Sequence, residues 1–304
     1  MLRIGFIDLD TSHPAAWLPI VRRSQKADVV AICDMGDVRG PGYAAQFAKT
    51  HGIPHACASP EEMAERVDAA VILGCNWDAH LERARPFVEA GKPVFIDKPV
   101  VGRMQDVELL DRWLKSGADI IGGSAVRYAP QVERLRAEVG PENIYSLFAT
   151  CPGDIFHYGI HSYELVTAVM GGGIAAVTYV GGERPAVFRL RYGDGRQALI
   201  QLETPAGRAH MIVSHTRGVD AVDLSRKDPY GPLIGHMLAH FRRERPFPTP
   251  TRLLLECCRA AIAGRLSRET GTEVPLSTLP SDAGYDGNAF ARAYRAALEA
   301  REPA

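Results

Sequence analysis

Through the first 125 positions, short apolar runs alternate with stretches whose apolar residues recur at helical spacing. Residues 3–9 and 28–33 are strand candidates that are mostly apolar, and residues 69–73 and 93–96 are continuous apolar runs, as strands are when both faces of a parallel sheet are covered. The helical stretches lie at residues 43–49, 60–66, 79–90 and 104–115, and a further strand is expected at 119–122. This alternation predicts an α/β domain with a doubly wound parallel sheet.

The pattern changes after about residue 140. Strands at short intervals, separated by turn signals such as Gly193-Asp194-Gly195, are typical of antiparallel hairpins. They are expected at residues 144–150, 175–180, 187–192, 198–203 and 209–215, with helices at 158–170, 233–242, 251–268 and 288–300. We therefore predict two domains, residues 1–123 and residues 124–304, the second being an α+β domain with a mainly antiparallel sheet.

Composition narrows the classes of function. The chain has 304 residues, 46% hydrophobic and 23% charged, with a formal net charge of −1. This balance gives no electrostatic footprint for nucleic acid or an anionic membrane, and no apolar run approaches the roughly 20 residues that span a bilayer. The six scattered cysteines and the absence of a basic leader predict reduced thiols and a cytoplasmic protein.

The apolar run at residues 93–96 continues into the sequence Asp97-Lys98-Pro99. With Arg127-Tyr128-x-Pro130, Gly159-Ile160-His161 and residues 269–276, this order of motifs resembles the Gfo/Idh/MocA family of glucose–fructose oxidoreductase and inositol dehydrogenase relatives. The resemblance covers most of the chain.

The resemblance implies a Rossmann-type domain that binds NAD or NADP, and a second domain that contributes to a homo-oligomer, a dimer or a tetramer. It also implies a small-molecule substrate such as a sugar or polyol. Lys98 matches the lysine of the family's E-K-P motif, and His161 matches its histidine, so both are the expected catalytic residues. Asp97 stands where the family has glutamate, beside the coenzyme.

The nucleotide-binding turn departs from the family. Aligning the first strand places Asp8, Asp10 and His13 where the three fingerprint glycines belong. One like-charge contact at ~4 Å costs about 4 kcal/mol at an effective dielectric near 20, against the roughly 8 kcal/mol of micromolar binding. The repulsion is avoided if the carboxylates turn aside and Thr11, Ser12 and the helix amides hold phosphate. Alternatively, residues 10–12 only cap the helix that begins near His13–Pro14.

At this turn Asp10, Thr11, Ser12 and His13 are the expected coenzyme contacts. The other expected contacts, Lys98 among them, lie at strand ends. Asp34 ends the second strand, where an acidic residue takes ribose hydroxyls, although it also suits a solvated loop. Cys75, Asn76 and His80 match the family's loop beside the coenzyme, and Asn76 could equally cap the following helix.

Substrate contacts are expected from Lys98, Arg127, Tyr128, His157 and His161. Arg127 could alternatively pair at the domain junction. His157 replaces a family aspartate, and its spacing of four residues from His161 predicts one shared helix face. With Glu164 nearby the pair resembles a metal-ligand set, but a third assured ligand is missing, so no metal is predicted.

The leading interpretation is an NAD(P)-dependent oxidoreductase of a sugar, polyol or related hydroxy compound. His161 is then the acid/base and Lys98 its electrostatic partner. The degenerate glycine turn keeps two alternatives open. One is a non-redox lyase, isomerase or hydrolase on the same scaffold, and the other is a non-catalytic binding protein.

Overall fold

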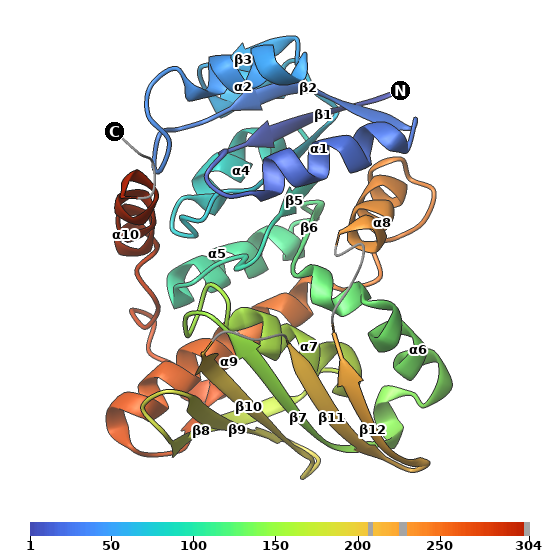
Figure 1. Cartoon of the computed structure of the whole chain (residues 1–304), viewed down its shortest axis with the longest axis vertical. Helices are drawn as coiled ribbons and strands as arrows, with labels where there is room; N and C mark the ends of the chain where they lie inside the picture. Colours follow the sequence, from blue (N-terminus) through green and yellow to red (C-terminus); the bar gives the residue numbers. More distant parts are fainter. Residues whose placement is uncertain (206–208, 225–229, 301–304) are drawn as a thin grey trace.

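The computed structural model describes residues 1–205, 209–224 and 230–300. Its amino-terminal half contains the predicted parallel sheet, six-stranded in the order β3-β2-β1-β4-β5-β6 (Figure 1). The strands are β1 (Leu2–Ile7), β2 (Ala27–Cys33), β3 (His55–Cys57), β4 (Ala69–Ile72), β5 (Val94–Ile96) and β6 (Ile120–Gly122). The strand order reverses between β1 and β4, which is where ligands bind in doubly wound sheets.

Helices cover both faces of this sheet, which explains why its strands are apolar throughout. On one face, the apolar residues of α1 (His13–Arg23), α2 (Tyr43–His51) and α8 (Gly231–Phe241) form one core. On the other face, α3 (Pro60–Ala64), α4 (His80–Glu89) and α5 (Met104–Lys115) belong to a second, larger core. Ser59 caps α3, because its Oγ accepts the N–H of Glu62 at 3.3 Å.

The second sheet has seven strands in the order β12-β11-β7-β10-β9-β8-β13. Neighbouring strands run antiparallel except β7 and β10, which are parallel. The mainly antiparallel prediction is confirmed, although the sequence did not reveal β12 or β13. The strands are β7 (Ile144–Pro152), β8 (Ile174–Gly181), β9 (Ala186–Tyr192), β10 (Gln197–Thr204), β11 (His210–His215), β12 (Gly218–Asp223) and β13 (Val274–Pro275).

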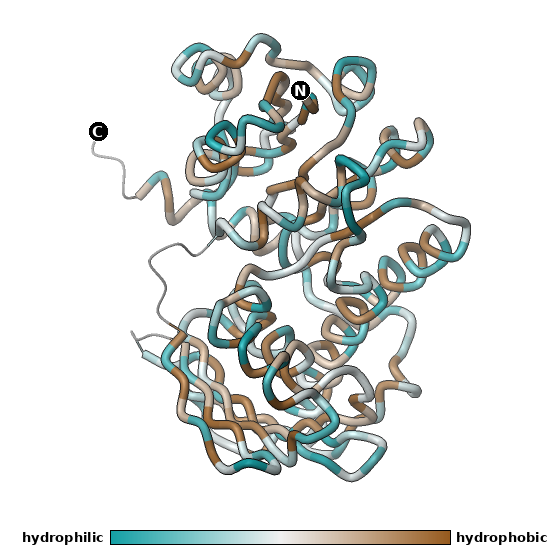
Figure 2. Tube along the Cα trace, turned by 90° about the vertical axis from the view of Figure 1, so that its right-hand side faces the viewer, coloured by the Kyte–Doolittle hydropathy of each residue, from teal (hydrophilic) through white to brown (hydrophobic). Residues whose placement is uncertain are grey.

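The helices α7 (Ile160–Met170) and α9 (Thr251–Thr270) lie between the two sheets and cover the inner face of the second one (Figure 1). Apolar residues alternate along its strands (Figure 2), and some of those on the outer face, such as Leu199 and Ile212, are exposed. The remaining helices are α6 (Pro130–Glu138) and three short 3₁₀ turns at Ala125–Tyr128, Pro141–Asn143 and Leu276–Thr278.

The last helix, α10 (Gly287–Glu299), returns to the first sheet (Figure 1). Asp286 caps it by accepting the N–H of Ala289 at 2.8 Å, and Asp78 accepts the N–H of Gly287 at 3.0 Å. Because α8 and α10 both pack beside elements of the first half, the division at residues 123 and 124 stays a prediction.

Within the described ranges, no helix is both long and apolar enough to cross a lipid bilayer. All six cysteines are buried and unpaired. The cytoplasmic location inferred from these thiols stays a prediction.

Candidate functional site

A cavity of about 180 Å³ lies at the carboxyl edge of the first sheet. It brings together Lys98, which follows β5, and His161, which lies in the first turn of α7. An amine and an imidazole from the two halves of the chain therefore share one cavity. The lining residues are Ser12, His13, Trp17, Asp97, Lys98, Ala125, Val126, Tyr158, His161 and Tyr230.

Lys98 is buried and held by the turn that precedes α7. Its Nζ lies 3.1 Å from His157 Nε2 and 3.4 Å from the His157 carbonyl oxygen, and 5.3 Å from the centre of the Tyr158 ring. Burial lowers the pKa of Lys98, opposed by Asp97 and Asp154. Burial and the neighbouring Lys98 also lower the pKa of His157 well below its usual value. A neutral His157 thus accepts a hydrogen bond from the ammonium.

His161 is oriented through Ser124. The Ser124 Oγ lies 2.6 Å from His161 Nδ1, and the Ser124 N–H donates to Glu164 Oε2 at 2.8 Å. Burial raises the pKa of Glu164 to about 7, against the pull of Arg127. When His161 Nδ1 donates to Ser124, its Nε2 keeps the lone pair that a general base needs.

The prediction that His157 and His161 share a helix face is wrong. The helix α7 begins only at Ile160, so His157 belongs to the preceding turn. His157 turns to Lys98, whereas Glu164 turns to Ser124 and Arg127. In the part of the chain that the structure describes, no three His, Cys, Asp or Glu side chains are grouped to hold a metal ion.

His13 and Asp97, both predicted to contact coenzyme, instead contact each other. His13 Nδ1 lies 2.5 Å from Asp97 Oδ2 in the same cavity as Lys98. Sequence reasoning missed this pair, which spans 84 positions. The signal was present in two coupled departures from the family, because an added ring and a shortened carboxylate complement each other.

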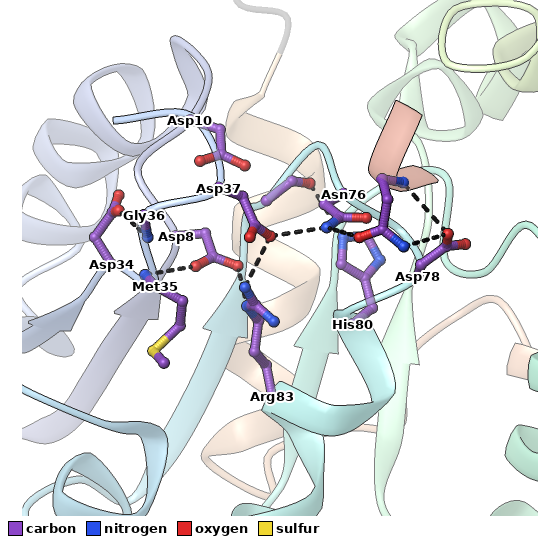
Figure 3. Close-up of polar contacts among 12 residues, drawn as sticks. Asp8, Asp10, Asp34, Met35, Gly36, Asp37, Asn76, Asp78, His80 and Arg83 are labelled. Carbon is purple, nitrogen blue, oxygen red and sulfur yellow. Dashed lines mark hydrogen bonds and ion pairs between the residues drawn. The ribbon is translucent and has the colours of Figure 1, made fainter. Parts of the chain in front are cut away.

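The degenerate glycine turn is filled by its own carboxylates (Figure 3). Asp8 keeps a glycine-like backbone, with φ of 60°. Its Oδ2 lies 2.6 Å from Arg83 Nε, a buried charge contact without good hydrogen-bond alignment. A methyl group at Gly74 would lie 2.8 Å from that oxygen. Burial raises the pKa of Asp10 to about 6, although Cys75 donates its N–H to it at 2.9 Å.

Carboxylates also accept hydrogen bonds from backbone amides that follow β1 and β2 (Figure 3). Asp34 accepts N–H groups from Leu9 at 2.8 Å and Gly36 at 2.9 Å, and Asp8 accepts the N–H of Met35 at 3.2 Å. In nucleotide-binding folds the amides of the turn after the first strand, where Leu9 lies, cradle phosphates, and the end of the second strand, where Met35 and Gly36 lie, receives the ribose. Here they are already paired.

The helix α10 covers the same edge. Its buried Ala291 packs with Val38 and Cys75, which follow β2 and β4, and Phe290 and Tyr294 add to that contact. Phe290 also lies 5.1 Å from the Trp77 ring and 4.7 Å from the His157 ring, centre to centre. The side chain of Asn76 donates to Asn288 Oδ1 at 3.1 Å.

The residues at this edge therefore do not fit a dinucleotide in the observed arrangement. The buried Asp10 Oδ1 is without a hydrogen-bond partner among the described residues, and it would meet a pyrophosphate with like charge. The cleft thus has two ends. We call the cavity at Lys98 and His161 the acid/base end. We call the edge at Asp8, Asp10 and Asp34 the nucleotide end, and it is self-filled because these carboxylates bind the chain's own amides.

Several predicted contacts are corrected. His80 is fully buried, and its ring nitrogens lie 3.0 Å from the Val100 carbonyl and 3.1 Å from the Gly74 carbonyl. It therefore links the segments after β4 and β5 and does not face the coenzyme edge. Arg127 and Tyr128 are buried at the junction, where both contact Thr249. They do not line the cavity.

The predicted phosphate-binding residues at the start of α1 differ from one another. Ser12 lines the cavity, and its side chain makes no cap hydrogen bond. Thr11 Oγ1 accepts the N–H of His13 at 3.2 Å. Among residues 10–12, the capping alternative is therefore met by Thr11 alone.

Comparison with known proteins identifies similar folds and sequences. Residues 2–121 match the family model GFO_IDH_MocA, described as an oxidoreductase family with an NAD-binding Rossmann fold. A candidate UDP-kanosamine synthase oxidoreductase subunit of Amycolatopsis mediterranei is 32% identical over 135 residues, 44% of this chain and 36% of the relative. The scyllo-inositol 2-dehydrogenase (NAD(+)) of Bacillus subtilis is 27% identical over 210 residues, 62% of this chain and 58% of the relative.

These matches span less than two thirds of either curated relative. Among solved structures, the myo-inositol dehydrogenase of Lactobacillus casei in complex with NAD(H) and myo-inositol superposes with a TM-score of 0.79. It covers 92% of this chain and 98% of that chain at 12% identity. At that identity the likeness establishes the fold.

Proposed function

Residues 2–121 match the model of the Gfo/Idh/MocA oxidoreductase family, and from that match we propose that the chain interconverts a hydroxyl and a carbonyl group of a small polyol-like compound. The observation that carries the proposal is the cavity shared by Lys98 and His161. Its volume of about 180 Å³ is below that of drug-sized pockets, which supports a small substrate.

His161 transfers the proton. To form a carbonyl group, the substrate hydroxyl loses its proton to His161 Nε2, while Ser124 holds Nδ1; the hydride on the same carbon would pass to an oxidised nicotinamide coenzyme, the acceptor that the redox proposal requires. In the reverse direction the protonated imidazole returns the proton.

Lys98 stabilises the negative charge that develops on that oxygen. The ammonium is held in place by His157 Nε2 and the His157 carbonyl, so it needs little reorganisation during the reaction. Burial of Lys98 excludes water and strengthens the electrostatic effect.

The family and its relatives support NAD or NADP as the redox partner. The Bacillus subtilis relative is named as an NAD(+) enzyme, and the Lactobacillus casei structure contains NAD(H). Because the nucleotide end of this cleft is self-filled, access for a dinucleotide would require α10 to move and the amides at Leu9, Met35 and Gly36 to be released.

The test is a turnover screen of inositols and other polyols, and of the corresponding ketones, with each nicotinamide coenzyme. Turnover that is lost in Lys98→Met and in His161→Asn supports the proposal. If neither NADH nor NADPH binds at millimolar concentration, to the full chain or to a chain ending at Pro280, the redox assignment is wrong.

A second candidate, a non-redox isomerase, lyase or hydrolase, is favoured by one specific observation. The carboxylates of Asp8, Asp10 and Asp34 already hold the amides at the nucleotide edge. Coenzyme-independent turnover that requires Lys98 and His161 would select this candidate. Binding of a polyol without turnover under any condition would instead select the non-catalytic alternative.

A homo-oligomer belongs to the same proposal. The second sheet exposes four large apolar side chains on β7, β10, β11 and the edge strand β12. They are Tyr145, Leu199, Ile212 and Val219, exposed by 57%, 39%, 49% and 67%. Exposed apolar patches commonly mark protein interfaces. Light scattering of Ile212→Asp against the unchanged chain tests it. A smaller assembly supports the interface, and an unchanged mass contradicts it.

A further inference from the structure

A second imidazole in the cavity has the geometry of an acid/base group. His13 Nδ1 lies 2.5 Å from Asp97 Oδ2, and the side chains of His13 and Asp97 are only 16% and 5% exposed. Both residues line the cavity that holds Lys98 and His161. His13 is the first residue of α1, and Asp97 directly follows β5, so two rigid elements position the pair.

Aromatic neighbours fix the orientation of the His13 ring. The fully buried Trp17 stacks on it at 5.3 Å and 17°, and Tyr230 contacts it edge-on at 5.1 Å. Since Nδ1 faces Asp97, the nitrogen available to the cavity is Nε2, which none of the described side chains hydrogen-bonds.

The charge of Asp97 suits the role of an orienting group. Burial by itself would raise the pKa of Asp97, but His13 and Lys98 together lower it below its usual value. An ionised carboxylate on Nδ1 holds the ring and stabilises the positive charge that develops when Nε2 takes a proton. Burial of an ionised carboxylate without such a partner would be strongly unfavourable.

We propose that His13 and Asp97 form a second acid/base dyad, which acts on a substrate polar atom next to the one served by His161. In this step a substrate O–H bond breaks, an N–H bond forms at His13 Nε2, and the electron pair stays on the substrate oxygen. The Nδ1 proton remains shared with Asp97, which acts by positioning the ring. The inference rests on the proposed function, since it assumes that His161 and Lys98 act on the same molecule.

The dyad also restricts the substrate. In a cavity of about 180 Å³, two acid/base centres reach atoms only a few ångströms apart. The substrate therefore carries two neighbouring oxygens, as a vicinal diol or an α-hydroxy ketone does. A compound with one hydroxyl group leaves the dyad without a partner and loses that interaction.

The experiment compares trans-1,2-cyclohexanediol with cyclohexanol as probes, in the unchanged chain and in His13→Gln and Asp97→Asn. A matched control is the pair His240 and Asp119, which are also in contact, at 2.7 Å, but do not line the cavity. His240→Gln and Asp119→Asn therefore report the effect of losing a His–Asp contact elsewhere in the fold.

We expect kcat for the diol to fall about 100-fold in both dyad variants, the usual contribution of a positioned acid/base, and to change less than twofold in the control variants. The preference for the diol over cyclohexanol should fall by the same factor. A decrease in melting temperature without a change in kcat would assign the dyad a structural role and overturn the inference.

A second measurement does not depend on turnover. In histidine labelled with ¹⁵N, the His13 imidazole signals should shift when the diol is added and stay unchanged with cyclohexanol. If Lys98→Met leaves turnover intact while the His13 signal shifts, the proposed function fails and the dyad stands. If neither probe moves the His13 signal, the dyad is contradicted, whatever the outcome for Lys98.

Discussion

The two ends of the cleft use the same kind of scaffold, the carboxyl ends of parallel strands, in opposite ways. At the acid/base end, Lys98, Asp97, His13 and His161 surround a cavity. At the nucleotide end, Asp8, Asp10 and Asp34 are bonded to the chain's own amides, and α10 packs over them. Family resemblance therefore carries over well at one end and poorly at the other, because each end is set by different local residues.

The largest effect is expected at the acid/base end. Lys98→Met and His161→Asn should each lower kcat about 1,000-fold, because they remove the charge stabilisation and the proton transfer. Steady-state kinetics with the polyol found by screening provide the measurement. His240→Gln, outside the cavity, should retain the original rate, and an equal loss there would remove the distinction between the two regions.

The nucleotide end is expected to affect stability. Burial raises the pKa of Asp8 to about 8, so above that pH Arg83→Met leaves an ionised Asp8, and Asp37, without the guanidinium that contacts both and should lower the free energy of unfolding by about 3 kcal/mol. Urea unfolding measures the change. Arg3→Met is the control, since its contact with Asp68 has the same 2.6 Å length as that of Arg83 with Asp8 but is exposed, where solvent screens the pair and leaves it little effect on stability. Equal effects would contradict the structural role of the buried pair.

Removing α10 sharpens the comparison further. A chain ending at Pro280 should bind NADH about tenfold more tightly than the full chain, equivalent to about 1.4 kcal/mol, because the edge near Val38 and Cys75 is uncovered. Fluorescence titration measures both affinities.

The point variant Tyr294→Ala should produce part of the same increase without truncation, because Tyr294 belongs to the face of α10 that packs near Val38 and Cys75. Arg292→Ala, which is exposed on the same helix, should produce none. Identical affinities in all four proteins would show that α10 does not obstruct the nucleotide.

The smallest expected effect is a pH dependence from Asp10. Its pKa is raised to about 6 by burial, so the folded state binds more protons than the unfolded state between pH 4 and 6. Stability from this group is therefore present at low pH and decreases as the pH rises through about 6.

Between pH 5 and pH 7 the change for one such group is about 1 kcal/mol. Asp10→Asn should remove that part of the dependence of the melting temperature, and the exposed Asp282→Asn should leave it intact. An unchanged pH profile in Asp10→Asn would contradict the unfavourable burial of this carboxylate.

The sequence predicted the architecture because both sheets follow from local pattern. Apolar stretches identified five of the six parallel strands but not β3, and Gly193-Asp194-Gly195 identified a hairpin. The position of Lys98 also followed from its place after a buried strand. By contrast, the contact of His13 with Asp97 spans 84 positions, and no local pattern reports such a distance.

Other parts of the site were unpredictable for related reasons. The periodicity of residues 288–300 indicated a helix with one apolar face, but periodicity does not specify which surface that face covers. Arg127 and Tyr128 were expected at the substrate because they belong to a motif of the resemblance, whereas the structure shows the stated alternative, in which Arg127 pairs at the junction. Their partner Thr249 is more than 100 positions away.

The central claim is that the cleft is available at Lys98 and His161 and closed on itself at Asp8 and Asp10. A crystal structure of the full chain, soaked with millimolar NADH and a polyol, tests it most directly. If α10 remains packed against Val38 and Cys75 in the crystal, we expect polyol density beside Lys98 and no dinucleotide density along the ends of β1, β2 and β4. A dinucleotide lying on the amides of Leu9 and Met35 beneath an undisplaced α10 would contradict the account.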